Sequence, residues 1–282
     1  MDHPAEWFLF LGTGGYLAAL GLTLFRLWGR REPMHGINFI LILAGWLVQS
    51  TGLWMLGMEA QSCPIRNPFE VLQFVSWSIV IIYLFTGQVF RLSLFGTGSA
   101  SLAALIGLAA FPIPGGMHIG PYSHLGGDPR IETHAALALF SYGIFGLIAV
   151  LSVLYLLQNY GLKTKKWASV FRFLPSIMDM DTVLLRLLIM ASAVYTLSIG
   201  IGALYWIEHM DQVSVTKMIF TLALWAAYGI VLALRLANRL FGTPLAWTCI
   251  ALMAAALFIL WPVEASRDHG FDPSPSEVST LS

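Results

Sequence analysis

Apolar runs long enough to cross a lipid bilayer dominate this chain of 282 residues. A transmembrane helix needs about 20 mostly apolar residues. By that criterion we predict eight helices, Trp7–Trp28, Gly36–Met58, Phe69–Phe90, Leu94–Phe111, His134–Leu157, Val183–Trp206, Val213–Leu234 and Pro244–Trp261. The expected fold class is therefore all-α, a polytopic membrane helix bundle. We expect residues 1–265 to form a single membrane domain, and 266–282 to be a polar, mobile C-terminal tail.

The composition agrees with a membrane protein and excludes several other classes. Hydrophobic residues make up 57% of the chain and charged residues 11%, whereas a soluble domain carries roughly 25% charged residues. The 15 Lys and Arg residues are balanced by 15 Asp and Glu residues, so no net positive field attracts nucleic acid. Cys63 and Cys249 are the two cysteines and show no CxxC spacing. A secreted disulfide scaffold, a nucleic-acid-binding protein and a disordered chain are excluded.

The distribution of basic residues predicts the orientation of the bundle. Most of the 15 Lys and Arg residues lie in the connections after the first, third, fifth and seventh predicted helices. The other connections and the tail contain Arg66, Arg130, Lys217 and Arg267. The positive-inside rule therefore places both termini outside. We expect a multi-pass protein of the cell (inner) membrane.

Histidine and aromatic residues collect on the predicted outer side. His134 begins the fifth predicted helix and His269 follows the eighth, while Trp77 and Trp206 lie near outer helix ends. Interfacial Trp and Tyr residues are common in any membrane protein. The alternative is a flat apolar ligand held between aromatic faces, with Arg130, Arg66 or Lys217 near its acidic groups. Haem has that character, with an apolar macrocycle, two propionates and an iron that accepts imidazole.

Glu70 lies at the start of the third predicted helix. The helix dipole favours a carboxylate there, and an ionisable group at the edge of a membrane span can also mark a site. No GxSxG, HExxH, P-loop or CxxCH motif occurs in the chain, so we assign no catalytic residue.

Three stretches together resemble the CcsA and HemX-like membrane proteins of cytochrome c assembly, which include the YpjD-type proteins. CPIRNPFEVLQFVSWSIVIIYL, residues 63–84, is similar to the family stretch CPLSNxYExLxFxSW. HAALALFSYGIFGL, from His134, resembles a family helix that opens with an outer histidine. KMIFTLALWAAYG keeps the spacing of Lys217, Trp225 and Tyr228 found in the family. The resemblance covers residues 30 to 270.

The resemblance implies a set of site residues. His134 and His269 would be the axial ligands of haem iron. The further haem-binding residues would be Trp206, Lys217, Arg130, Trp77 and Glu70. The family core WGxxWxWDPKE is largely missing, since Val215 and Met218 stand where Asp and Glu are expected. This departure favours an accessory member over a full synthetase.

Two functions follow as hypotheses. The first is a haem-handling protein that binds haem on the outer face for delivery or attachment to apocytochrome c, together with other cytochrome assembly proteins. The alternative is a haem-free regulatory or scaffolding protein of tetrapyrrole or respiratory complex biogenesis. A transporter is disfavoured because the predicted spans contain few ionisable residues. Small residues in SIGIGA, residues 198–203, predict close helix contacts at Gly200 and Gly202.

Overall fold

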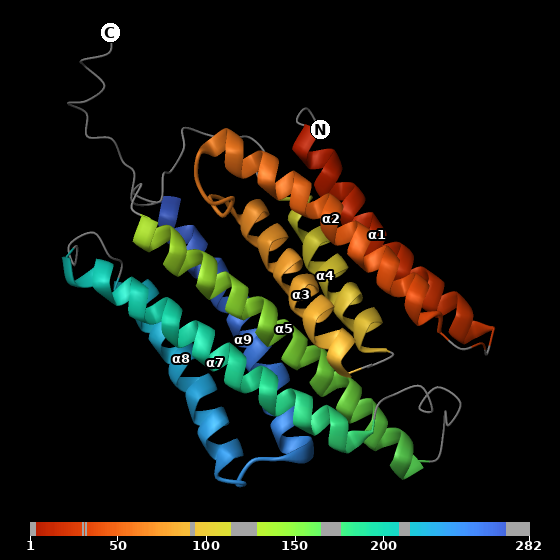
Figure 1. Ribbon diagram of the computed structural model, residues 1–282. Helices are drawn as coiled ribbons and strands as arrows, with labels where there is room; N and C mark the ends of the chain where they lie inside the picture. Colours follow the sequence, from red (N-terminus) through yellow and green to blue (C-terminus); the bar gives the residue numbers. More distant parts are fainter. Residues whose placement is uncertain are drawn as a thin grey trace, which may run out of the picture.

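The computed structural model is a bundle of α-helices (Figure 1). It describes residues 4–29, 31, 33–90, 94–113, 129–164, 176–208 and 215–268, and no strand occurs among them. In chain order the helices are α1 (Pro4–Trp28), α2 (His35–Ala60), α3 (Pro68–Phe90), α4 (Phe95–Ala110), α5 (Pro129–Thr164), α7 (Ile177–Glu208), α8 (Val215–Leu236) and α9 (Gly242–Asp268). The all-α prediction is confirmed.

Six helices are long and apolar enough to cross a membrane, namely α1, α2, α3, α5, α7 and α8. Helix α4 and the segment Gly242–Phe258 of α9 are shorter apolar helices. The chain is therefore a multi-pass membrane protein. Each described helix corresponds to one predicted apolar run, but α5 and α7 extend beyond their runs at both ends. Helix α9 continues to Asp268, past residue 265 where the sequence predicted the membrane domain to end.

Helices α1 and α2 lie side by side along much of their length (Figure 1). Glycines face one another across this contact. A Cβ atom on Gly45 would lie 2.8 Å from the carbonyl oxygen of Gly12 and 3.0 Å from the ring of Tyr16. Lipid tails are as apolar as the helices, so association depends on close packing of this kind. The α1–α2 contact therefore has no room for a side chain at these positions.

A chain of buried hydrogen bonds joins the first four helices. The Tyr16 hydroxyl of α1 donates to Gln49 Oε1 of α2 at 2.6 Å. Gln49 Nε2 donates to Gln73 Oε1 of α3 at 2.8 Å, and Gln73 Nε2 donates to the Gly107 carbonyl of α4 at 3.0 Å. A buried amide is costly unless it is hydrogen-bonded. These bonds therefore fix the register of α1, α2, α3 and α4 together.

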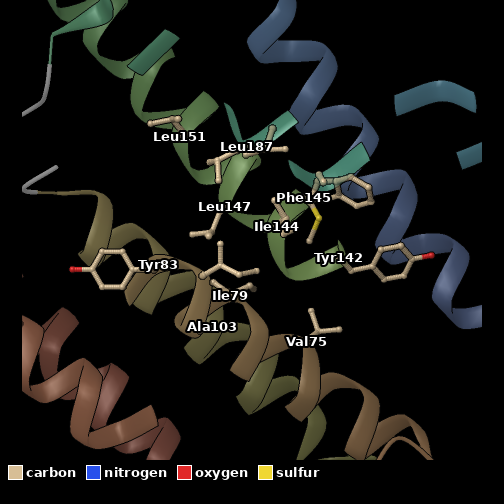
Figure 2. Packing of buried hydrophobic residues seen from close by; sticks show 14 of the residues in the cluster. Val75, Ile79, Tyr83, Ala103, Tyr142, Ile144, Phe145, Leu147, Leu151 and Leu187 are labelled. Atoms are coloured by element: carbon tan, nitrogen blue, oxygen red, sulfur yellow. The ribbon is translucent and has the colours of Figure 1, made fainter. Parts of the chain in front are cut away.

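Helix α5 connects the two halves of the bundle. Val75 and Ile79 of α3 face Ile144 and Leu147 of α5 in the core (Figure 2). On its other sides α5 packs against α7 and α9. There the Phe145 ring stacks on Tyr228 of α8, with centroids 3.6 Å apart. Because α5 packs against α3, α7 and α9, these helices determine what surrounds the residues at its N-terminus.

Candidate functional site

Four helix ends meet at one end of the bundle. These are the C-terminal ends of α2 and α7 and the N-terminal ends of α3 and α5. The backbone N–H of Cys63, in the α2–α3 connection, donates to Glu132 Oε2 in the first turn of α5 at 3.3 Å. Arg130 of α5 pairs with Glu208 of α7 at 2.8 Å. We call this region the histidine end, because His134 lies in it.

His134 is held against α7 by hydrogen bonds to one residue. Its ring atom Nδ1 lies 2.7 Å from the Ser198 carbonyl oxygen and 3.2 Å from Ser198 Oγ. Ser198 Oγ also donates to the backbone carbonyl of His134 at 2.8 Å. The His134 side chain is half-buried. Two contacts at Nδ1 orient the ring, and the third ties the His134 backbone to the same residue.

Ser198, Gly202 and Trp206 form a stripe along α7 that faces His134. They are spaced four residues apart, which places them on one face of a helix. A Cβ atom on Gly202 would lie 2.5 Å from His134 Nδ1. The Trp206 ring meets the imidazole edge to face, with centroids 5.6 Å apart. The structure thus brings together His134, Trp206 and Arg130, three of the residues that the sequence singled out.

Glu70 has a local partner of its own. Its carboxylate accepts hydrogen bonds from Arg66 Nη2 at 2.6 Å and from the Arg66 backbone N–H at 2.8 Å. The backbone N–H of Glu70 donates to Asn67 Oδ1 at 2.8 Å, which caps the start of α3. The described contacts of Glu70 therefore organise the α2–α3 connection. A role for Glu70 at haem stays a prediction.

Trp77 belongs to a second region, between α2 and α3. Its indole N–H donates to Ser50 Oγ at 2.7 Å, and its ring stacks on Trp46 at 5.8 Å between centroids. It also lines an apolar groove of about 280 Å³, together with Ser50, Leu53, Trp54, Gly57, Met58, Pro64 and Phe74. These contacts lie on α2, α3 and their connection. Haem binding by Trp77 likewise stays a prediction.

The remaining predicted site residues lie partly or wholly outside the described part of the chain. His269 follows the last described residue, Asp268. Lys217 is in the first turn of α8, and its side chain is not among those described. Within the described ranges, no group of three or more His, Cys, Asp or Glu side chains could hold a metal ion. The histidine end therefore offers one fixed imidazole, with no multidentate metal cage in the described part.

Ser198 is the neighbour of His134 that sequence reasoning missed. The available signal was the small-residue segment SIGIGA, which was interpreted only as a helix contact. At Gly202 that interpretation is confirmed, but at Gly200 it is wrong, since a Cβ atom there would meet nothing within 4 Å. Residues two apart on a helix do not share a face, so one of the pair had to point elsewhere.

Comparisons with known proteins place the chain in a family. The family model described as "Cytochrome C assembly protein" matches residues 65–265. The chain is 28% identical to Protein HemX of Brevibacillus brevis over 62% of this chain and 64% of that protein. It is 25% identical to Protein HemX of Bacillus subtilis (strain 168) over 83% of this chain and 86% of that protein.

A third relative carries a different name. The chain is 32% identical to the cytochrome c biogenesis protein CcsA of Cyanidium caldarium, over 57% of this chain and 56% of that protein. The match thus spans less than two thirds of this relative and of the Brevibacillus brevis protein. The family model, in contrast, includes α3 and every later described helix almost to the end of α9. The chain belongs to the cytochrome c assembly protein family.

Proposed function

We propose that this protein binds haem non-covalently at the histidine end, with His134 as an axial ligand of the iron, and holds or delivers it for attachment to apocytochrome c. Membership of the family supports a role in c-type cytochrome biogenesis. The observation that carries the proposal is the fixed His134 ring, hydrogen-bonded through Nδ1 at 2.7 Å. An imidazole that is anchored through one nitrogen is a typical metal ligand through the other.

The residues at the histidine end fit a haem group. Haem iron takes at most two axial ligands from protein, so a single imidazole can serve one face of the macrocycle. His269 is the second ligand that the resemblance predicts. Trp206 lies edge-on to His134 and offers an aromatic surface to an apolar macrocycle. Bound haem would supply two acidic propionates and an iron that accepts imidazole.

Arg130 is the candidate partner for a propionate. It is 39% exposed and pairs with Glu208, which is 55% exposed. An exposed ion pair of this kind is worth about 0–1 kcal/mol. Exchange of the Glu208 carboxylate for a propionate at Arg130 would therefore give up little stability from this ion pair. In this proposal the histidine end faces the outer side of the inner membrane, where apocytochrome c and other assembly proteins would meet it.

The test is the absorption spectrum of protein purified from haem-replete membranes. We expect a Soret band that weakens strongly in His134→Ala. His35→Ala is the matched control, because His35 is an exposed histidine at the start of α2, at the opposite end from the α2–α3 connection. Equal Soret bands in the two variants would remove His134 as a ligand. A flat spectrum for the unmodified protein, reduced and oxidised, would contradict haem binding.

One observation favours a second function. Val215 and Met218 replace the acidic residues of the family core, and two of the relatives carry the name HemX. A haem-free regulatory or scaffolding protein of tetrapyrrole or respiratory complex biogenesis would need neither acidic residue. This alternative predicts a stable membrane complex with partner proteins and no Soret band.

A further inference from the structure

We infer that Ser198 and Gly202 of α7 are positioning residues, which hold neutral His134 in the Nδ1–H tautomer and leave Nε2 as the atom offered to a metal. This inference rests on the proposed function only for the identity of the metal, haem iron. The tautomer itself is a property of the protein without haem. Neither residue was among the predicted site residues.

The identity of the acceptors at Nδ1 determines the tautomer. The Ser198 backbone oxygen, 2.7 Å from Nδ1, can only accept a hydrogen bond. Ser198 Oγ, 3.2 Å from Nδ1, has one hydrogen, which it gives to the His134 carbonyl at 2.8 Å. Both oxygen atoms therefore present lone pairs to Nδ1. Nδ1 must carry the proton, and a neutral imidazole has only one.

The other ring nitrogen is consequently an acceptor. With the proton on Nδ1, Nε2 has an unshared lone pair, which is the form that binds a metal. The hydrogen bonds that described residues make to this ring all reach Nδ1. The most stable tautomer of free histidine places the proton on Nε2, where it would block coordination through that atom. Ser198 thus selects the ligating form before any metal arrives.

Gly202 provides the space in which this hydrogen bond forms. A Cβ atom at this position would lie 2.5 Å from Nδ1 and 2.8 Å from Cε1 of His134. Both separations are far inside van der Waals contact, so even alanine would displace the ring from Ser198. Gly200, two residues earlier, has open space around its own Cβ position. The requirement for glycine is therefore specific to the position that faces the imidazole.

The first measurement uses the protein without haem. Long-range ¹H–¹⁵N correlation spectra of ¹⁵N-histidine-labelled protein in detergent distinguish the two tautomers, and His134→Ala assigns the signal. We expect a protonated Nδ1 in the unmodified protein and in the control variant Gly200→Ala. Gly202→Ala should shift His134 toward the Nε2–H form. An Nε2–H signal in the unmodified protein, or the same spectrum in both glycine variants, would overturn the inference.

A second variant covers the case in which Gly202→Ala does not fold. Ser198→Ala removes Oγ but keeps the backbone carbonyl, so it should retain part of the Nδ1–H preference. Ser198→Thr keeps the hydroxyl and should restore the preference of the unmodified protein. If Ser198→Ala and Ser198→Thr change the tautomer equally, the Ser198 hydroxyl has no positioning role and that part of the inference fails.

Haem titration then separates the inference from the proposed function. Loss of a hydrogen-bond partner behind a metal ligand typically costs 10–100-fold in affinity, so Gly202→Ala should bind haem 10–100-fold more weakly than Gly200→Ala. Equal affinities would overturn the positioning role. If the unmodified protein shows the Nδ1–H tautomer but binds no haem, the proposed function fails while the tautomer assignment stands.

Discussion

The two halves of the bundle differ in the contacts at their centres. Glycines of α1 and α2 face one another in the first half. The hydrogen-bonded side-chain amides of Gln49 and Gln73 link α1, α2, α3 and α4. Helices α5, α7 and α8 meet at a cluster of aromatic rings, in which Phe145 packs against Tyr195 and stacks on Tyr228. The candidate ligand His134 lies in the second half, and the family match begins at residue 65, after α1 and α2.

The contrast has a physical consequence for each half. In lipid, a separated amide finds no water to replace its partner, so Gln49 and Gln73 allow α1 to α4 only one register. Aromatic packing depends on shape and dispersion and has no such directional requirement. In the described structure the Tyr228 hydroxyl is buried without a hydrogen-bond partner. At this aromatic cluster, packing is therefore set mainly by side-chain volumes, whereas the His134 end of the same half is held by the hydrogen bonds of Ser198.

The largest effect is expected from emptying the aromatic centre. Phe145→Ala removes a fully buried ring from between Tyr195 and Tyr228. We expect the free energy of unfolding to fall by about 3–5 kcal/mol, the usual cost of a Phe→Ala cavity. Phe258→Ala is the matched control, since Phe258 of α9 is 78% exposed. Denaturation in mixed detergent measures both, and similar losses would show that the rings are not the main support of this half.

A smaller loss is expected from the glycine contact of the first half. Gly45→Leu places a side chain where a Cβ atom already meets the Gly12 backbone, and overpacking typically costs about 1–3 kcal/mol. Gly14→Leu is the control, because a Cβ atom on Gly14 meets nothing within 4 Å. Thermal unfolding in detergent should separate the two variants. We also expect Gly45→Leu to leave the His134 tautomer unchanged, and a changed tautomer would mean that the halves are not independent.

The reactivity of Cys63 reports on the contact between the α2–α3 connection and α5, where the Cys63 backbone N–H bonds to Glu132. Burial, and after it the negative charges of Glu132 and Glu70, together raise the pKa of the Cys63 thiol to about 11. The thiolate is the reactive form. Alkylation by iodoacetamide at pH 8 should therefore run roughly two orders of magnitude slower than at a free cysteine with a pKa of about 8.5. The rate at Cys63 should rise about tenfold per pH unit until the pH approaches the Cys63 pKa of about 11.

Removal of the Glu132 carboxylate tests the contact between Cys63 and α5. Glu132→Gln takes away the charge beside Cys63, which lowers the pKa of the thiol and should speed alkylation several-fold. Glu208→Gln removes a carboxylate that pairs with Arg130 at the same end and should leave the rate unchanged. Peptide mass spectrometry distinguishes Cys63 from the buried Cys249. Equal rates in both variants would place the α2–α3 connection away from α5.

The fold was more predictable from sequence than the site. Apolar runs define membrane helices almost by themselves, because lipid admits few other structures. Which face of one helix meets which neighbour depends on packing and is not encoded in run length. Trp77 and His134 both lie near predicted outer helix ends. Their positions along the helices could not show that Trp77 bonds to a residue of α2 and His134 to a residue of α7. Ser198 and Gly202 carried no chemical signal until α7 was placed against α5.

The contact between His134 and Ser198 also sets an order of events during synthesis. The two residues are 64 positions apart in the chain. The α1–α2 hairpin has its complete glycine contact as soon as α2 enters the membrane. His134 belongs to α5, whereas the residues that orient its ring belong to the later helix α7. A chain that stops short of α7 has the histidine but lacks Ser198 and Gly202, so the proposed Nδ1–H geometry would form only once α7 is in place.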